Sequence, residues 1–297
     1  MSAVLPQVFP QNYTFRNIST RFDEQHGALW CILDPKPKAC FSIDVLEEIR
    51  RFQDGVRRFA GNGNSRELRY VILASRTPGV FNFGGDLALF ARCVADNDSD
   101  TLRKYARACI DVLHPQAVGY GLPITTISLV QGDALGGGFE AALCSEILIA
   151  ERGCQMGFPE VLFNLFPGMG AYGLLERRIG MLGSERMLLN GKLYRAEELH
   201  AQGVVDILAE GGRGESALYD YIAGDSGKCN ARAGVLKARR LLRPIRYEQL
   251  LEVAEVWVET AMRLGPRETR KMERLARTQE RLPAKEPAPT GLKEIIA

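Results

Sequence analysis

The chain has 297 residues, 46% of them hydrophobic and 25% charged, which is ordinary for a globular protein built around a large core. Its formal net charge is only +2, so the composition does not indicate a nucleic-acid binder, and we expect no nucleic-acid partner. No apolar stretch approaches the roughly 20 residues needed to cross a bilayer, so we expect no membrane span.

Seven cysteines are scattered along the chain without paired spacing, and several stand in apolar runs. This pattern predicts buried, reduced thiols and neither disulfides nor a zinc site. The first residues lack the basic start and apolar run of a signal peptide. We therefore expect a cytoplasmic protein. His26, His114 and His200 are not spaced as metal ligands, so we expect no metal.

The first part of the chain alternates strand and helix patterns. Residues 13–23 and 28–33 predict two strands of a hairpin. Ser42 is a suitable N-cap for an amphipathic helix that ends at residues 61–64, and residues 69–74 predict the next strand. Strand, helix and strand in this order favour a right-handed crossover.

A pair of glycines follows that strand. After the apolar segment 80–83, Gly84 and Gly85 allow a ligand to approach the backbone closely, and residues 86–95 predict a helix. Taken alone, the pair is equally typical of an ordinary strand-to-helix turn.

The stretch 123–170 places two carboxylates beside a glycine turn. A buried strand, 124–130, leads into three consecutive glycines, 136–138, and then into a helix whose first turn carries Glu140. Backbone N–H groups at such a helix start favour an oxygen anion. Glu160 stands on a loop twenty residues further on. Each glutamate alone has a structural explanation, as a dipole partner or a solvated loop residue, but together they can form a general acid–base pair.

The chain then shifts towards helices. Residues 171–179, 184–189 and 196–202 predict short helices, and 204–208 predict a last strand. Repeated strand and helix units predict an α/β core over residues 1–210.

An arginine-rich helical region is predicted over residues 211–282. Its long helix, 235–264, is either continuous or broken at Pro244, and Trp257 lies on its apolar face. Core packing alone would explain that tryptophan. Residues 283–297 contain a proline-rich segment and are expected to form a flexible tail.

Residues 168–173 match the glycine pattern of a dinucleotide-binding turn. Pro167 stands directly before them, where the first strand of such a unit should end, so we reject NAD binding. The sequence contains no P-loop either.

Taken in order, the segments NFGGDLALF, ALGGGFE and GFPEVLFNLFPGMG resemble the motifs of the crotonase (enoyl-CoA hydratase/isomerase) superfamily. The resemblance covers roughly residues 12–210. Within the superfamily the chain is most similar to the diffusible signal factor synthases of the RpfF type, because of the first segment, both glutamates and the arginine-rich helical region. The resemblance implies a crotonase fold, an α/β fold of repeated ββα units in a spiral of sheets, with an α-helical C-terminal region.

The resemblance also implies an oxyanion hole made by two backbone N–H groups. Matching the motifs places these groups on Phe83 and Gly137. The family commonly has a small residue at the position of Phe83, so Gly84 is the alternative donor. The other residues expected to contact substrate are Gly85, Gly136 and Trp257.

The implied activity has two steps. Glu140 and Glu160 dehydrate a 3-hydroxyacyl thioester to a cis-2-enoyl thioester, and hydrolysis then releases a free cis-2-unsaturated fatty acid that acts as a quorum-sensing signal. Two alternatives stay open. An ordinary enoyl-CoA hydratase of β-oxidation would use the same glutamates, whereas a binding protein that sequesters a regulator would not need them.

The expected partners follow from the same resemblance. Acyl carrier protein is the expected carrier of the substrate, with coenzyme A as the alternative, and no further cofactor is implied. The basic run 232–246 is a candidate docking surface for an acidic carrier protein, although a solvated helix face explains it equally well. The resemblance further implies a sensor-kinase receiver domain as partner and assembly into a trimer or hexamer.

Overall fold

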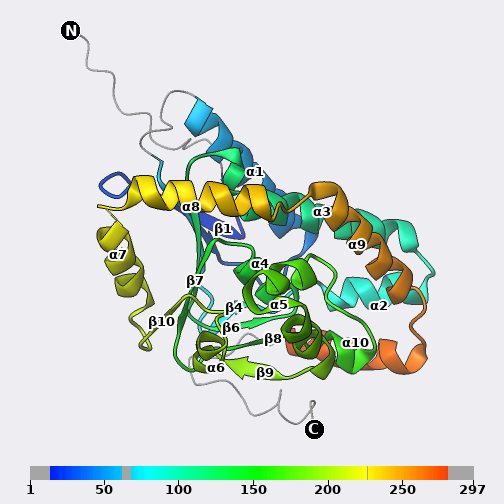
Figure 1. Cartoon of the computed structure of the whole chain (residues 1–297). Coiled ribbons are helices and arrows are strands. Elements are labelled where there is room, and N and C mark those ends of the chain that lie inside the picture. The colour runs from blue at the N-terminus through cyan, green and yellow to red at the C-terminus, as the bar shows by residue number, and fades with distance from the viewer. Residues whose placement is uncertain (1–13, 62–67, 226, 280–297) are drawn as a thin grey trace.

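The computed structural model describes residues 14–61, 68–225 and 227–279 (Figure 1). Two sheets organise these residues, and their strand orders are β1-β2-β3-β5-β7-β10 and β4-β6-β8-β9. The first sheet contains β1 (Ile18–Asp23), β2 (Ala28–Leu33), β3 (Tyr70–Ser75), β5 (Thr125–Val130), β7 (Ile147–Glu151) and β10 (Ile207–Ala209). The second contains β4 (Val80–Asn82), β6 (Asp133–Leu135), β8 (Gln155–Gly157) and β9 (Leu193–Arg195).

A unit of two strands and a helical segment repeats along the chain. The strands β3 and β4 lead into α2 (Leu87–Ala95), β5 and β6 lead into α4 (Gly137–Leu143), and β7 and β8 lead into the 3₁₀ turn η3 (Pro159–Phe163). The strands β4, β6 and β8 are parallel neighbours in the second sheet. Three strand-to-helix turns therefore lie side by side at one edge of this sheet, and the predicted ββα repeat is confirmed.

The larger sheet is covered on both faces. Helices α1 (Ile43–Gly61) and α3 (Ser99–Ala117) share one apolar cluster with alternate residues of the central strands, whereas α7 (Gly214–Asp225) packs on the opposite face. Neighbouring residues of β2 show the alternation, since Leu29 belongs to the first cluster and Trp30 to the second. All six residues of β5 are buried, as expected for a central parallel strand.

The middle of the chain differs from the predicted elements in detail. The sequence did not predict β4, β6, β8 and β9, because strands of three residues are too short to show a period of two. The assigned helix α5 (Ala171–Asn190) is interrupted at Gly180, whose φ of 72° and ψ of 170° are not helical. That break separates the two helices predicted for this segment. The next helix is α6 (Ala196–Ala201).

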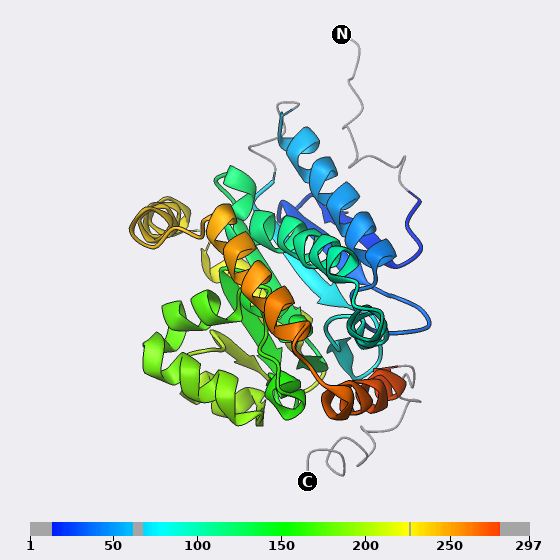
Figure 2. The ribbon, with the colours of Figure 1, turned by 90° about the vertical axis from the view of Figure 1, so that its right-hand side faces the viewer.

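Three helices follow α7, namely α8 (Cys229–Leu242), α9 (Tyr247–Ala261) and α10 (Pro266–Gln279). Of the two forms considered for residues 235–264, the broken one is observed, with Pro244 between α8 and α9. Figure 2 shows α9 running alongside α3, and α10 packs against α2 and η3. The predicted flexible tail lies outside the described residues.

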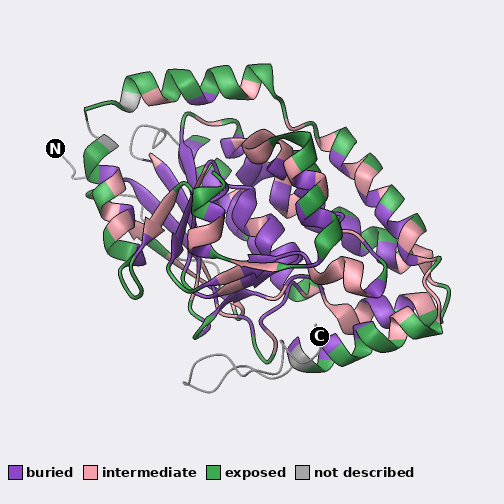
Figure 3. Ribbon diagram, turned by 60° about the horizontal axis from the view of Figure 1, so that its bottom comes forward, coloured by how far each residue is buried: buried purple, intermediate pink, exposed green. Residues whose placement is uncertain are grey.

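Helix α8 is largely exposed, as Figure 3 shows, and Arg240 ties it to the sheet region of the protein. Arg240 forms an ion pair of 2.8 Å with Glu146, whose side chain is only 4% exposed. Its guanidinium also donates to the carbonyls of Leu122 and Ile124, at 3.1 and 3.0 Å. Arg240 is therefore an anchor and does not belong to a free basic surface.

The prediction of buried thiols is confirmed for the six cysteines whose side chains are described, all of which are unpaired. Within the described ranges, none of the helices is both long and apolar enough to cross a bilayer.

Candidate active site

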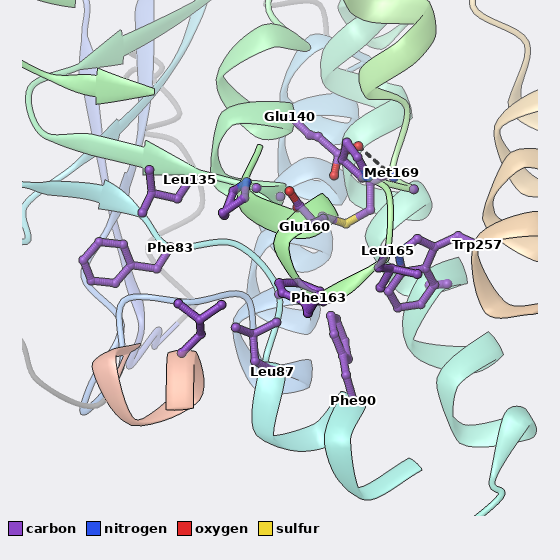
Figure 4. Close-up of a pocket in the computed structure, with 18 of the residues that line it drawn as sticks. Phe83, Leu87, Phe90, Leu135, Glu140, Glu160, Phe163, Leu165, Met169 and Trp257 are labelled. Carbon is purple, nitrogen blue, oxygen red and sulfur yellow. Dashed lines mark hydrogen bonds between the residues drawn. The ribbon is translucent and has the colours of Figure 1, made fainter. Parts of the chain in front are cut away.

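A pocket lies where the three strand-to-helix turns meet the C-terminal helices. The turn after β4 contributes Gly85, the turn after β6 contributes Gly136 and Gly137, and η3 carries Glu160. Figure 4 shows the carboxyl groups of Glu140 and Glu160 on the same side of the pocket. The apolar walls include Phe83, Leu87, Phe90, Phe163, Trp257 and Leu275. An apolar pocket with a few converging polar groups is typical of a small-molecule site.

Glu140 is held at the start of α4 and is 1% exposed. Its Oε1 accepts hydrogen bonds from the backbone N–H groups of Met169, at 2.8 Å, and Ala171, at 2.9 Å. Burial raises the pKa of Glu140 to about 7, and the two hydrogen bonds act in the opposite direction by favouring the carboxylate.

Glu160 has a different environment. Within the described residues its Oε2 is buried without a hydrogen-bond partner. Burial, followed by the nearby charge of Glu140, raises the pKa of Glu160 to about 8. Both raised pKa values lie near neutral pH, and the charge of one carboxylate opposes ionisation of the other, so the pair can hold one proton between them.

Two backbone N–H groups face the same space. Helix α4 begins at Gly137, so the N–H of Gly137 has no partner within the helix. The N–H of Gly85 finds no acceptor among the described residues. The two segments are in close contact, since a Cβ built on Gly137 would lie 3.4 Å from the Gly85 nitrogen. Gly85 and Gly137 can thus donate together to one oxygen atom.

This geometry corrects the assignment of one oxyanion-hole donor. The N–H of Phe83 donates to the Ala39 carbonyl at 2.7 Å, and that of Gly84 donates to Asn82 Oδ1, also at 2.7 Å. Both groups are used within the protein, so assigning the donor to Phe83 or Gly84 was wrong. Gly85, which we expected only to contact substrate, offers the N–H instead.

Gly84 has its own requirement for glycine. Its φ is +87°, in the region that side chains disfavour, and a Cβ there would lie 2.8 Å from both Gly137 N and Leu135 O. Because glycine has no Cβ, the turn after β4 can lie directly against the start of α4, and the two N–H groups come close together.

Trp257 lies in the pocket wall and packs on Gly168. A Cβ on Gly168 would lie 2.3 Å from Trp257 Cγ, and the indole ring meets the Phe90 ring edge-on at 5.0 Å between centroids. One glycine of the dinucleotide-like pattern therefore accommodates an aromatic ring. The side chain of Met169, which covers Gly137 at the centre of the pocket, was not predicted.

Sequence reasoning also missed Gln279, a pocket residue at the end of α10. Its side-chain amide is bonded to the turn after β4, and the residue is 5% exposed. No sequence signal could identify it, because an isolated glutamine in a charged amphipathic helix looks like a surface residue. In the described part of the chain, no three His, Cys, Asp or Glu side chains are grouped so as to hold a metal ion.

The fold and the site can now be compared with known proteins. A sequence profile described as enoyl-CoA hydratase/isomerase matches residues 34–210. Mouse mitochondrial methylglutaconyl-CoA hydratase is 28% identical over 182 residues, which are 61% of this chain and 54% of that protein. The chain therefore matches only about half the length of this curated relative.

Solved structures share the fold. An enoyl-CoA hydratase from Bacillus halodurans has a TM-score of 0.72 at 23% identity, over 87% of this chain and all of that one (100%). Pseudomonas aeruginosa DspI has a TM-score of 0.68 at 22% identity, over 84% of this chain and 98% of that one. These likenesses and the repeated ββα units define the crotonase fold with an α-helical C-terminal region. Because the family profile matches more than half of the chain, the protein belongs to the enoyl-CoA hydratase/isomerase family.

Proposed function

We propose that this protein dehydrates a 3-hydroxyacyl thioester to a 2-enoyl thioester and then hydrolyses the thioester to a free cis-2-unsaturated fatty acid. The observation that carries the first step is the pair of glutamates in the pocket, Glu140 with two backbone hydrogen bonds and Glu160 with a buried, unpartnered Oε2, beside two N–H groups without an acceptor among the described residues. The apolar pocket suits an acyl chain, because few polar groups line it.

Dehydration begins with the thioester carbonyl oxygen between the N–H groups of Gly85 and Gly137. Loss of the α-proton makes this oxygen anionic, and each hydrogen bond then strengthens. One such donor typically lowers the barrier by ~2.7–4 kcal/mol. One glutamate accepts the α-proton, and the other protonates the departing 3-hydroxyl to give water. The pair starts and ends with one proton in total, which has moved from one glutamate to the other.

The same groups can serve the hydrolysis. A glutamate carboxylate takes a proton from water as the water oxygen attacks the thioester carbon, and the carbonyl oxygen becomes a tetrahedral oxyanion in the same hole. Collapse of this intermediate breaks the carbon–sulfur bond, and the sulfur leaves as a thiol after it takes up the proton. The products are the free acid and the thiol of the carrier.

An ordinary enoyl-CoA hydratase is the second candidate. It is favoured by the names of the mouse relative and of the Bacillus halodurans structure, both of which are hydratases. Hydration and dehydration share one transition state, so the glutamate pair supports both functions equally. The two candidates differ in the fate of the thioester bond.

Product analysis separates them. Purified protein is incubated with 3-hydroxyacyl thioesters of acyl carrier protein and of coenzyme A, and free acid, enoyl thioester and released thiol are quantified. The proposal expects free acid and one thiol per acid, with the carrier-protein thioester as the better substrate. Enoyl or hydroxyacyl thioester alone, without released thiol, establishes the hydratase instead.

Amide variants test the glutamates. Glu140→Gln and Glu160→Gln keep the shape of the side chain but cannot transfer a proton, so each is expected to lower the dehydration kcat by at least about 100-fold. Glu24→Gln, at an exposed turn, is the matched control and is expected to retain full activity. Near-wild-type turnover of a folded Glu140 or Glu160 variant at saturating substrate would exclude that residue from the chemistry.

A further inference from the structure

The side chain of Gln279 joins the last described helix to the turn that carries Gly85. Its Nε2 donates to the carbonyl oxygens of Phe83, at 3.1 Å, and Gly85, at 2.9 Å. Its Oε1 accepts a longer bond of 3.4 Å from the N–H of Leu87, at the start of α2. Figure 4 shows α10, in faint red, beside Phe83 at the edge of the pocket.

We infer that Gln279 is a positioning residue that fixes the orientation of the Gly85 N–H, an inference that rests on the oxyanion hole of the proposed function. The Gly85 N–H belongs to the peptide group between Gly84 and Gly85. Gln279 binds the carbonyls of the peptide groups on either side of it. Fixing both neighbours restricts rotation of the group between them.

The turn needs such restraint because two of its residues are glycines, which resist backbone rotation least. Its N–H groups are anchored from inside the protein, since Asn82 Oδ1 accepts from Gly84 and the Ala39 carbonyl accepts from Phe83. Of its carbonyl groups, that of Gly84 accepts from the Phe41 N–H at 2.8 Å, and Gln279 anchors the other two, those of Phe83 and Gly85. An oxyanion hole is effective only when its donors are already aligned before the charge develops.

The side chain is suited to this task in charge and location. An amide donates two hydrogen bonds from one nitrogen, matching the two carbonyls, and carries no charge that would perturb the glutamate pair. Gln279 is 5% exposed and lines the active-site pocket, so water does not compete freely for these carbonyls. The C-terminal helical region thus supports the catalytic geometry in addition to walling the pocket.

The experiment measures carbonyl polarisation directly. The absorption of para-dimethylaminocinnamoyl-coenzyme A moves to longer wavelength when its thioester carbonyl is polarised, so it reports on the oxyanion hole without turnover. Gln279→Met keeps the length of the side chain and removes both donors. It is expected to reduce this red shift and to lower kcat by roughly 10-fold or more, with KM within about twofold. This loss in kcat is smaller than that expected from removing a donor itself, which is ~100-fold or greater.

Glu273→Gln, at an exposed position of the same helix, is the control and should leave the red shift and kcat unchanged. A normal red shift and kcat in Gln279→Met overturn the positioning role while leaving the oxyanion hole intact. Absence of any red shift in the wild-type protein overturns the hole itself, and with it this inference.

A second variant covers the case in which Gln279→Met does not fold. In Gln279→Glu, a protonated carboxyl donates one hydrogen bond to the turn, whereas a carboxylate repels both carbonyls. Its red shift, divided by that of the wild type at the same pH, is expected to be larger at about pH 5 than at about pH 8. A ratio of one at both pH values contradicts the inference.

Discussion

Burial raises the pKa of both Glu140 and Glu160, and the charge of Glu140 raises that of Glu160 further. Their pKa values are raised to about 7 and about 8, so the singly protonated pair is most populated between these values. We expect kcat/KM for a small pantetheine thioester to be bell-shaped in pH, with its maximum between about 7 and 8. A profile that stays flat from pH 5 to pH 9 would contradict a catalytic pair with these properties.

The raised pKa of Glu160 also affects stability. An unfolded glutamate loses its proton near its ordinary value of 4.5, whereas folded Glu160 keeps it until about pH 8. Between these values the folded state binds the extra proton, so the free energy of unfolding falls as pH rises through this window. Glu160→Gln cannot ionise, and its gain in stability over wild type is expected to be larger at pH 8 than at pH 4.5 by at least about 1 kcal/mol.

Urea unfolding of both proteins at the two pH values measures that difference. Glu24→Gln, whose carboxyl group is exposed, should show no comparable change with pH. If the free energies of unfolding of Glu160→Gln and wild type differ by the same amount at both pH values, the pKa of Glu160 is not raised in the way described.

The contact at Gly84 provides a steric test of the oxyanion hole. Alanine at Gly84 would place its Cβ against Gly137 N and Leu135 O, so it must move the turn away from α4. Gly79 is the matched control, because it also has a positive φ, of +69°, but no atom lies within 4 Å of a Cβ there. Both alanine variants have backbone strain of about 1–3 kcal/mol. Only Gly84→Ala is expected to lower kcat in addition. Equal kcat values for the two variants would argue against the contact.

At the scale of elements, Trp257 and Gly168 define how α9 docks on the loop before α5. Gly168→Ala is expected to displace the indole ring, lower the melting temperature and raise KM for long-chain acyl thioesters more than for short ones. Gly173→Ala is the control, because a Cβ there meets nothing within 4 Å and alanine favours the helix. A normal KM for long chains in Gly168→Ala would remove Trp257 from the acyl pocket wall.

The elements that could be predicted are those whose pattern is local. The hydrophobic period of α1, the apolar run of β5 and the glycine break within α5 are all visible in the sequence. The two glutamates could be predicted because both stand in recognisable motifs. By contrast, the motif could not show which N–H group of the turn is left without an acceptor. That depends on which groups Ala39 and Asn82 already bind, and these contacts exist only in the folded protein.

The contact made by Gln279 could not be predicted, for a related reason. Gln279 is separated from Phe83 by 196 residues, and helical periodicity cannot identify which distant backbone a side chain will contact. The limits of the core, residues 1–210, and of the helical region after it stay predictions, as does assembly into a trimer or hexamer.

At the scale of the whole molecule, the structure narrows the surface on which a carrier protein could dock. Arg240 is an anchor, but Lys237 in α8 and Arg246 directly before α9 are exposed. Changing both to glutamate is expected to lower kcat/KM for the carrier-protein substrate about 10-fold or more at low salt, and less at high salt, with little change for a small pantetheine thioester.

Lys104→Glu, an exposed charge reversal on α3, is the control for a charge reversal outside this surface and is compared with the single Lys237→Glu variant, which changes the net charge equally. An equal loss of kcat/KM on the protein-borne and small substrates, or no loss on either, would exclude this surface as the docking site. The receiver-domain partner remains a separate prediction.

The bond between Gln279 and Phe83 has a consequence for the order in which activity appears during synthesis. The ribosome completes the glycine turn and both glutamates long before it makes α10. A nascent chain can therefore fold its sheets and enclose the glutamates while the carbonyls of the turn are still solvated. We expect such a chain, which lacks the part of the pocket wall that Leu275 supplies, to bind thioesters more weakly and to react with them slowly. Full catalytic competence then arises only when α10 docks, so this contact makes activity depend on synthesis and release of the chain through residue 279.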